Sequence, residues 1–226
     1  MCINKKSSLL LQLIIKTTIL IIKSSKVCLR DILKRVGIIK EIVINMENEI
    51  FRGNLLDIGT DNYGIIYNIY KQYNEDSNLQ YINGADEKEN IKLGYYNNCI
   101  LLFSFSNIFF KKNRVNLIRD IYKYLKEDGN IYIWDIDKKI RETFNGEIKI
   151  LLPGEKVKNI SIKDLNVLKD SSLDATVKVL EPYFEIKDLK SSDGVYYIKG
   201  KKKTSTNSKD DEKRKEEPNE STTSSH

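Results

Sequence analysis

A short loop of small and acidic residues is the chemically most distinctive part of this 226-residue sequence. It runs from Gly59 through Thr60 and Asp61 to Gly64, and Asp57 precedes it in an apolar run. A dinucleotide-binding loop has glycine at three set positions (G-x-G-x-x-G), so that the backbone can approach a diphosphate at a helix N-terminus. Here Asp61 takes the second glycine position, where its carboxylate would repel a diphosphate and attract a cation. The loop therefore disfavours NAD and ATP and favours a positively charged ligand.

Asp86 is a second candidate for ligand binding, because it follows the short apolar run 79–82. An ionised carboxylate has two acceptor oxygens and can hold both hydroxyl groups of a ribose. Parallel strands end at a common edge of their sheet, so Asp57 and Asp86 are expected to lie near one ligand. A solvated acidic turn would have the same local sequence, and that interpretation stays open.

Several kinds of site are excluded by the residues that the sequence lacks. Its single histidine, His226, is the last residue, and Cys2, Cys28 and Cys99 form no C-x-x-C pair. Ser-His-Asp and Cys-His nucleophiles, zinc fingers and H-E-x-x-H metal sites are therefore excluded, and no metal site is predicted. Sparse cysteines favour a reducing compartment, so we expect a cytoplasmic protein.

Short apolar runs alternate with helical periodicity, which is typical of a parallel sheet covered by helices. The predicted strands are 54–58, 79–82, 99–105 and 131–134, and the predicted helices are 64–73, 112–125 and 173–180. Two final strands, 184–189 and 195–198, flank a loop of hairpin length. The predicted fold is α/β, a Rossmann-like, mostly parallel sheet flanked by helices that ends in an antiparallel β-hairpin. Residues 141–169 are expected to be less regular.

The charge distribution divides the chain into three parts. Residues 1–45 have nine Lys or Arg and two Asp or Glu, whereas residues 46–200 have 22 and 24. The predicted domain, 46–200, is therefore slightly acidic, and no nucleic-acid partner is predicted. Residues 201–226 contain no apolar side chain and are predicted to be a disordered polar tail.

Residues 1–45 are predicted to be a basic and apolar N-terminal extension. Their most apolar stretch, 9–22, is interrupted by Gln12 and Lys16 and is shorter than the roughly 20 residues of a spanning helix. No membrane partner is predicted, although a membrane-associated accessory protein that makes peripheral contact through 9–22 stays an alternative. The extension could instead form amphipathic helices on the domain, or precede a natural start at Met46.

Five segments, in this order, resemble the class I S-adenosylmethionine-dependent methyltransferases. They are LLDIGTDNYG (55–64), Gly84-Ala85-Asp86, YNNCILLFSFSNIF (96–109), YLKEDGNIYIWDID (124–137) and the closing hairpin, 184–203. The resemblance implies S-adenosyl-L-methionine as cofactor, with its methionine end near Asp57 and Gly59 and its ribose on Asp86. The implied cofactor-binding set is Asp57, Gly59, Thr60, Asp61, Gly64 and Asp86, and no catalytic residue is assigned.

The resemblance implies methyl transfer to an unidentified, small-molecule acceptor, with the protein placing a nucleophile in line with the methyl group. The acceptor is expected over the residues after the fourth strand and under 141–169. SFSN (104–107) differs from the motif of the family members that methylate amino groups of nucleic-acid bases or glutamine, so that subclass is disfavoured. Asp61 and Tyr63 depart from the small residues of the family's loop, and only twelve residues separate Asp86 from Cys99. A degenerate member that serves as a binding or interaction module is therefore the alternative.

Other polar residues near the predicted strand ends have structural interpretations. Ser104, Ser106 and Asn107 either line a substrate pocket or form a turn, and the turn is favoured. For Trp134, Asp135 and Asp137 we expect a buried indole and two solvated acids.

Overall fold

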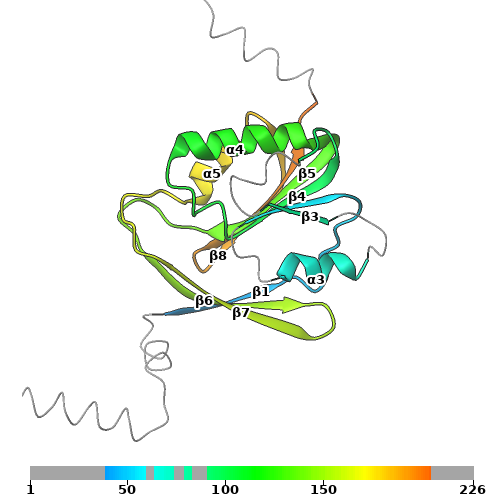
Figure 1. The fold of residues 1–226 in the computed structure, drawn as a ribbon. Helices are drawn as coiled ribbons and strands as arrows, with labels where there is room; N and C mark the ends of the chain where they lie inside the picture. Colours follow the sequence, from blue (N-terminus) through cyan, green and yellow to red (C-terminus); the bar gives the residue numbers. More distant parts are fainter. Residues whose placement is uncertain (1–38, 60–63, 74–78, 83–90, 205–226) are drawn as a thin grey trace, which may run out of the picture.

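The computed structural model describes residues 39–59, 64–73, 79–82 and 91–204, which form an α/β fold with two sheets (Figure 1). The larger sheet has six strands, in the spatial order β3 (Leu79–Ile82), β2 (Leu55–Ile58), β4 (Tyr96–Leu102), β5 (Leu125–Ile136), β9 (Val195–Lys202) and β8 (Phe184–Ser192). The smaller sheet has the order β1 (Lys40–Asn45), β6 (Phe144–Leu152) and β7 (Lys156–Asp164). The helices are α3 (Ile65–Lys71), α4 (Lys111–Tyr124) and α5 (Leu173–Leu180).

Both sheets are mixed, so the predicted mostly parallel arrangement is not confirmed, whereas the α/β class and the closing hairpin are. β3, β2, β4 and β5 are neighbours in parallel, but β9 is antiparallel to both β5 and β8. The turn between β8 and β9 contains Asp193 and Gly194, with φ angles of 56° and 84°. Two consecutive residues with positive φ match the twist of a tight hairpin, which makes this pair of strands antiparallel.

Residues 141–169 are more regular than predicted, because they contain the β6–β7 hairpin. Buried and less buried side chains alternate along β6, with Phe144, Ile148, Ile150 and Leu152 facing the core. Gly154 and Glu155 make the turn, with φ angles of 72° and 58°. A strand with one buried face can cover another layer, and here the hairpin covers the larger sheet.

β1 belongs to the smaller sheet, although its residues were assigned to the N-terminal extension. It pairs in parallel with β6 from Lys40 opposite Gly146 to Asn45 opposite Leu151. Ile42 and Met46 are buried, with 4% and 0% of their surface exposed. The folded unit therefore includes residues on both sides of the predicted boundary at 45 and 46.

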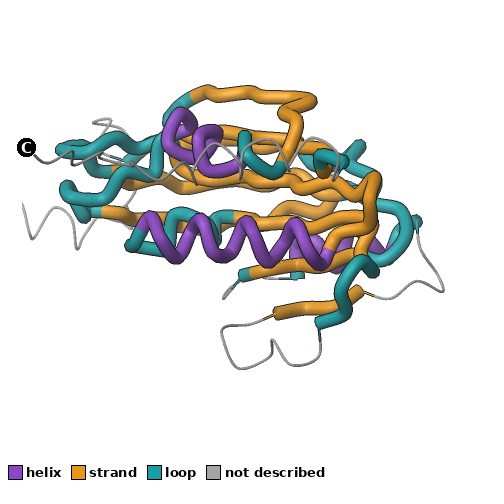
Figure 2. The backbone as a smooth tube through the Cα atoms, turned by 90° about the horizontal axis from the view of Figure 1, so that it is seen from above, coloured by secondary structure: helices purple, strands orange, loops and turns teal. Residues whose placement is uncertain are grey.

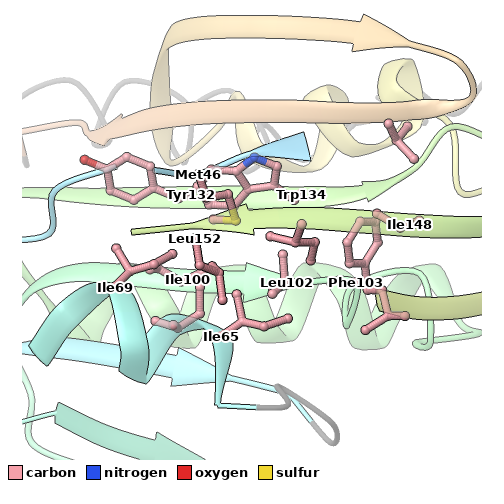
Figure 3. Close-up of a cluster of buried hydrophobic side chains, with 14 of the residues drawn as sticks. Met46, Ile65, Ile69, Ile100, Leu102, Phe103, Tyr132, Trp134, Ile148 and Leu152 are labelled. Carbon is pink, nitrogen blue, oxygen red and sulfur yellow. The ribbon is translucent and has the colours of Figure 1, made fainter. Parts of the chain in front are cut away.

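Two apolar clusters cover the two faces of the larger sheet. One joins that sheet to α3 and to the smaller sheet, and Figure 3 shows its side chains meeting from β4, β5, α3 and β6. The other lies under α4 and α5, which lie over the opposite face (Figures 1 and 2). Among the described residues, no helix has the length and apolar character that crossing a membrane requires. Residues 9–22 lie outside the described part of the chain.

A buried lysine fixes the connections before β6 and after β7. Lys138 is 1% exposed, and its ammonium donates to the carbonyl oxygens of Asn166 at 2.7 Å and Lys169 at 2.8 Å. Lys138→Met keeps the bulk of the chain but leaves these oxygens without their donor, so we expect a loss of about 2 kcal/mol in unfolding free energy. Urea unfolding measures this loss, and Lys139→Met, at an exposed neighbour, is the control. Equal stability of the two variants would contradict the assigned role of Lys138.

Candidate functional site

β2 lies at a switch point of the larger sheet. From β2 the chain passes through α3 to β3 on one side, while β4 lies on the other side of β2. The register places Ile58 opposite Ile82, so β2 and β3 end at the same level. In sheets of this kind a ligand binds in the crevice outside the carboxyl ends of the strands at the switch point. The fold therefore places a candidate site at the ends of β2 and β4.

Asp57 is a buried acid next to this edge. It is the third of four residues in β2, lies beside Ile100 of β4 and is 1% exposed. Burial raises the pKa of the Cys99 thiol, and the negative charge of Asp57 raises it further. Cys99 therefore stays a neutral thiol at neutral pH and is no nucleophile. The carboxylate of Asp57 gives this end of the sheet a negative field.

Gly59 follows β2, and Ser104 follows β4 after one residue; the two lie against each other. A Cβ atom at Gly59 would lie 3.4 Å from the Cβ atom of Ser104, which is an ordinary contact. The hydroxyl of Ser104 donates to the carbonyl oxygen of Ile58 at 2.7 Å. Ser104 thus joins the ends of β2 and β4. The described packing alone therefore does not demand a glycine at position 59.

Gly64 sets the start of α3. Its φ of 66° is in the left-handed region, which favours glycine, and its carbonyl accepts the backbone N–H of Asn68 at 3.0 Å and the side-chain amide at 2.7 Å. Asp57, Gly59 and Gly64 therefore belong to one strand–loop–helix unit at the switch point. Thr60, Asp61 and Asp86, the other predicted cofactor-binding residues, lie outside the described residues.

The segment after β4, residues 103–109, forms a lip over the strand ends. Phe103 has a φ of 51°, and its N–H donates to the carbonyl of Trp134 in β5 at 2.8 Å. A left-handed non-glycine residue stores strain that the surrounding contacts must hold. The amide of Asn107 donates back to the carbonyl of Phe103 at 3.3 Å. Asn107 thus forms a turn, as predicted, and Ser104 uses its hydroxyl to fasten the lip.

Asp135 is fully buried, so its prediction as a solvated acid was wrong, whereas Trp134 is buried as predicted. The carboxylate of Asp135 accepts two backbone N–H groups, those of Ser106 and of the next residue, Ile136, each at 2.7 Å. Burial raises the pKa of Asp135, and those hydrogen bonds and the charge of Arg114 oppose the rise. Asp137 is half-buried and accepts the N–H of Leu173 at 3.1 Å. Asp135 therefore holds the lip against β5.

Arg114 holds the same lip from α4 and was missed by the sequence analysis. It is 5% exposed and donates to the carbonyl of Ile108 at 2.8 Å, to the carbonyl of Asp170 and to the hydroxyl of Ser171 at 3.3 Å. Its position four residues before Ile118, on the apolar stripe of α4, was the signal for its burial.

Lys169 completes the attachment of the lip. Its ammonium donates to the carbonyl of Ser106 at 2.7 Å and pairs with the carboxylate of Asp164 at 2.6 Å. The lip is therefore fastened to β2, β5, α4 and the segment after β7, and it is a rigid border of the candidate site.

The described residues fit a cationic ligand better than a diphosphate. Asp57 supplies negative charge at the strand end, and the left-handed backbone of Gly64 stands where the chain enters α3. A sulfonium group beside a buried carboxylate is favoured by Coulomb attraction, and a phosphate there is not.

No family model and no curated protein matches the chain. Solved structures do match. A putative type 11 methyltransferase from Sulfolobus solfataricus is 16% identical, with 68% of this chain and 85% of that chain covered and a TM-score of 0.42. The N-methyltransferase NodS from Bradyrhizobium japonicum, in complex with S-adenosyl-L-homocysteine, is 8% identical, with coverages of 66% and 78% and a TM-score of 0.43. The CcbJ methyltransferase from Streptomyces caelestis is 7% identical, with coverages of 67% and 89% and a TM-score of 0.48. All three are named as methyltransferases, the first of them as a putative one.

Proposed function

We propose that this chain binds S-adenosyl-L-methionine at the ends of β2 and β4 and transfers its methyl group to a small-molecule acceptor. One observation carries the proposal: β2, the strand at the switch point, has a buried acid one residue before its end and is followed by a connection with glycine at both ends. The negative field of Asp57 selects a cation, and the switch point gives it a crevice. Asp86 is proposed to hold the ribose, because in the sequence it closely follows β3, and β3 ends level with β2.

The residues of the chain would act by binding and orientation. The bound cofactor supplies a methyl group already attached to a good leaving group. Asp57 and the connection 59–64 would hold the sulfonium end, while the fastened lip, 103–109, fixes one wall against which an acceptor is oriented. Holding two reactants in line contributes several kcal/mol by removing translational and rotational freedom before reaction. A catalytic histidine is not required for such a displacement.

Calorimetric titration tests the proposal with four ligands: S-adenosyl-L-methionine, S-adenosyl-L-homocysteine, ATP and NAD. We expect the first two to bind and the last two not to bind. Asp57→Asn is expected to weaken binding of the cationic ligand by about tenfold or more, because the neutral amide removes the negative charge. Asp128→Asn, an exposed acid near the other end of β5, is the matched control and should bind as the wild type does.

Two outcomes of that titration would overturn parts of the proposal. If ATP or NAD binds in preference to both methionine derivatives, the cationic site is refuted. If Asp86→Ala binds as tightly as the wild type, the ribose assignment fails while the site at β2 stands. Binding without methyl transfer to any acceptor would favour the degenerate binding module.

A further inference from the structure

A cavity of about 610 Å³ lies beside the lip, and Phe109 of the lip lines it. It is bordered by the first turn of α4, by one side of α5 from Asp174 to Val179, by residues 139–140 and by residues 168–170. Its volume is within the usual range for small-molecule sites, roughly 300–1,000 Å³. The lip reaches both the end of β2 and the cavity, because Ser104 contacts the end of β2 while Phe109 lines the cavity.

Apolar side chains that are exposed to solvent converge on this cavity. Phe109, Ile140 and Leu168 line it and are 48%, 54% and 77% exposed. Each comes from a different segment, and Val179 of α5 adds a buried apolar wall. Covering such surface with an apolar ligand is favourable by roughly 25 cal/mol per Å². The cavity therefore suits a ligand with an apolar body.

The rim of the cavity is cationic. Five cationic side chains and only two carboxylates line it. Arg114 and Lys169 are already engaged with the lip, but Lys111, Lys139 and Lys178 are exposed, and within the described part of the chain no ion pair involves their ammonium groups. The charges and the apolar walls select one chemical class.

We propose that this cavity binds the acceptor as a small molecule with an apolar body and a carboxylate or phosphate group. The assignment as acceptor site rests on the proposed function, whereas the binding of such an anion does not. The anionic group lies at the rim among Lys111, Lys139 and Lys178, and the apolar body contacts Phe109 and Leu168. A concave site of this volume favours a small molecule over an extended anionic surface such as a lipid bilayer.

Calorimetric titration with octanoate and phenyl phosphate tests this proposal, with octylamine and 1-octanol as probes of matched apolar size. Both anions are expected to bind at least tenfold more tightly than octylamine, and their binding is expected to weaken with added salt because exposed charges are screened. Equal binding of octanoate, octylamine and 1-octanol would overturn the anionic preference. Lack of binding by both anions would overturn the site itself.

Variants place the binding in the cavity. Lys139→Gln and Lys178→Gln are each expected to weaken octanoate binding by about two- to fivefold, the usual range for one exposed charge. Lys156→Gln, at an exposed lysine of β7, is the control and should bind octanoate unchanged. Ala175→Phe fills the cavity from α5 and is expected to abolish binding. If the lysine variants bind octanoate as the wild type does, the rim assignment is refuted even where Ala175→Phe fails to fold.

The same samples separate this inference from the proposed function. S-adenosyl-L-homocysteine binding without octanoate binding refutes the cavity and leaves the cofactor site intact. Octanoate binding without S-adenosyl-L-homocysteine binding refutes the methyltransferase and leaves an anion site. Sedimentation with phosphatidylglycerol vesicles tests for a membrane surface instead. If the wild type and Ala175→Phe both bind vesicles and the wild type does not bind octanoate, the cationic surface binds membranes and the proposal is overturned.

Discussion

A chain that begins at Met46 is expected to be less stable by about 3–5 kcal/mol than a chain that begins at residue 39. The longer truncation removes β1, which pairs with β6 along six residues and buries Ile42. Burying one isoleucine contributes roughly 1.5–3 kcal/mol, and each lost hydrogen bond adds about 1 kcal/mol. Truncation at Met46 also places a charged amino group on a residue with 0% exposure.

Urea unfolding of the two truncated chains measures this difference, and the full chain is the reference. The exposed edge of β6 should also make the shorter chain prone to association. Equal unfolding midpoints would show that β1 contributes little to the fold. The comparison bears on the hypothesis of a natural start at Met46, because such a protein would lack β1.

Asp135→Ala is expected to reduce the unfolding free energy by about 3–4 kcal/mol. The change removes the acceptor of two N–H groups, those of Ser106 and Ile136, on residues that are 4% and 1% exposed. A buried donor without an acceptor costs about 1–3 kcal/mol. Asp137→Ala is the control; it removes the hydrogen bonds from the N–H of Leu173 and the exposed hydroxyl of Ser191 at a half-buried neighbour, and it should cost about 1–2 kcal/mol.

The pH dependence distinguishes the role of the Asp135 carboxyl from simple packing. Because burial raises its pKa in the folded state, the folded protein holds the proton more tightly than the unfolded chain does. The stabilisation from protonation is complete below the ordinary pKa and is lost as the pH rises through the raised folded value. Relative to Asp135→Asn, the wild type should therefore lose stability as the pH rises through this interval. Parallel stability curves would contradict a raised pKa.

The elements that position the candidate site were predicted because their patterns are local. β2, α3, β4 and α4 each show an apolar run or a helical stripe within a few residues, and the structure confirms them. β6 also had a local signal, since buried residues alternate from Phe144 to Leu152 before a Pro-Gly turn, and this signal was missed. β1 had no local signal that identifies its partner strand, because that partner, β6, lies about a hundred residues later in the chain.

The burial of Asp135 and Lys138 was not predictable from the sequence in the same way. Asp57 and Asp135 each stand one residue before the end of a strand, and Asp135 is also covered by the lip, whose Ser106 N–H it accepts. Lys138 is buried because two segments, one before β6 and one after β7, bring three carbonyl oxygens to its ammonium group. Such burial depends on segments distant in sequence, which no local pattern records.

A crystal structure of the chain with S-adenosyl-L-homocysteine tests the central claim most directly. We expect the ligand at the ends of β2 and β4, beside Gly59 and Ser104, with its amino acid portion near Asp57 and its ribose hydroxyls on Asp86. Ligand bound only in the cavity beside α5, or an empty crevice at a concentration that saturates binding in solution, would contradict the account.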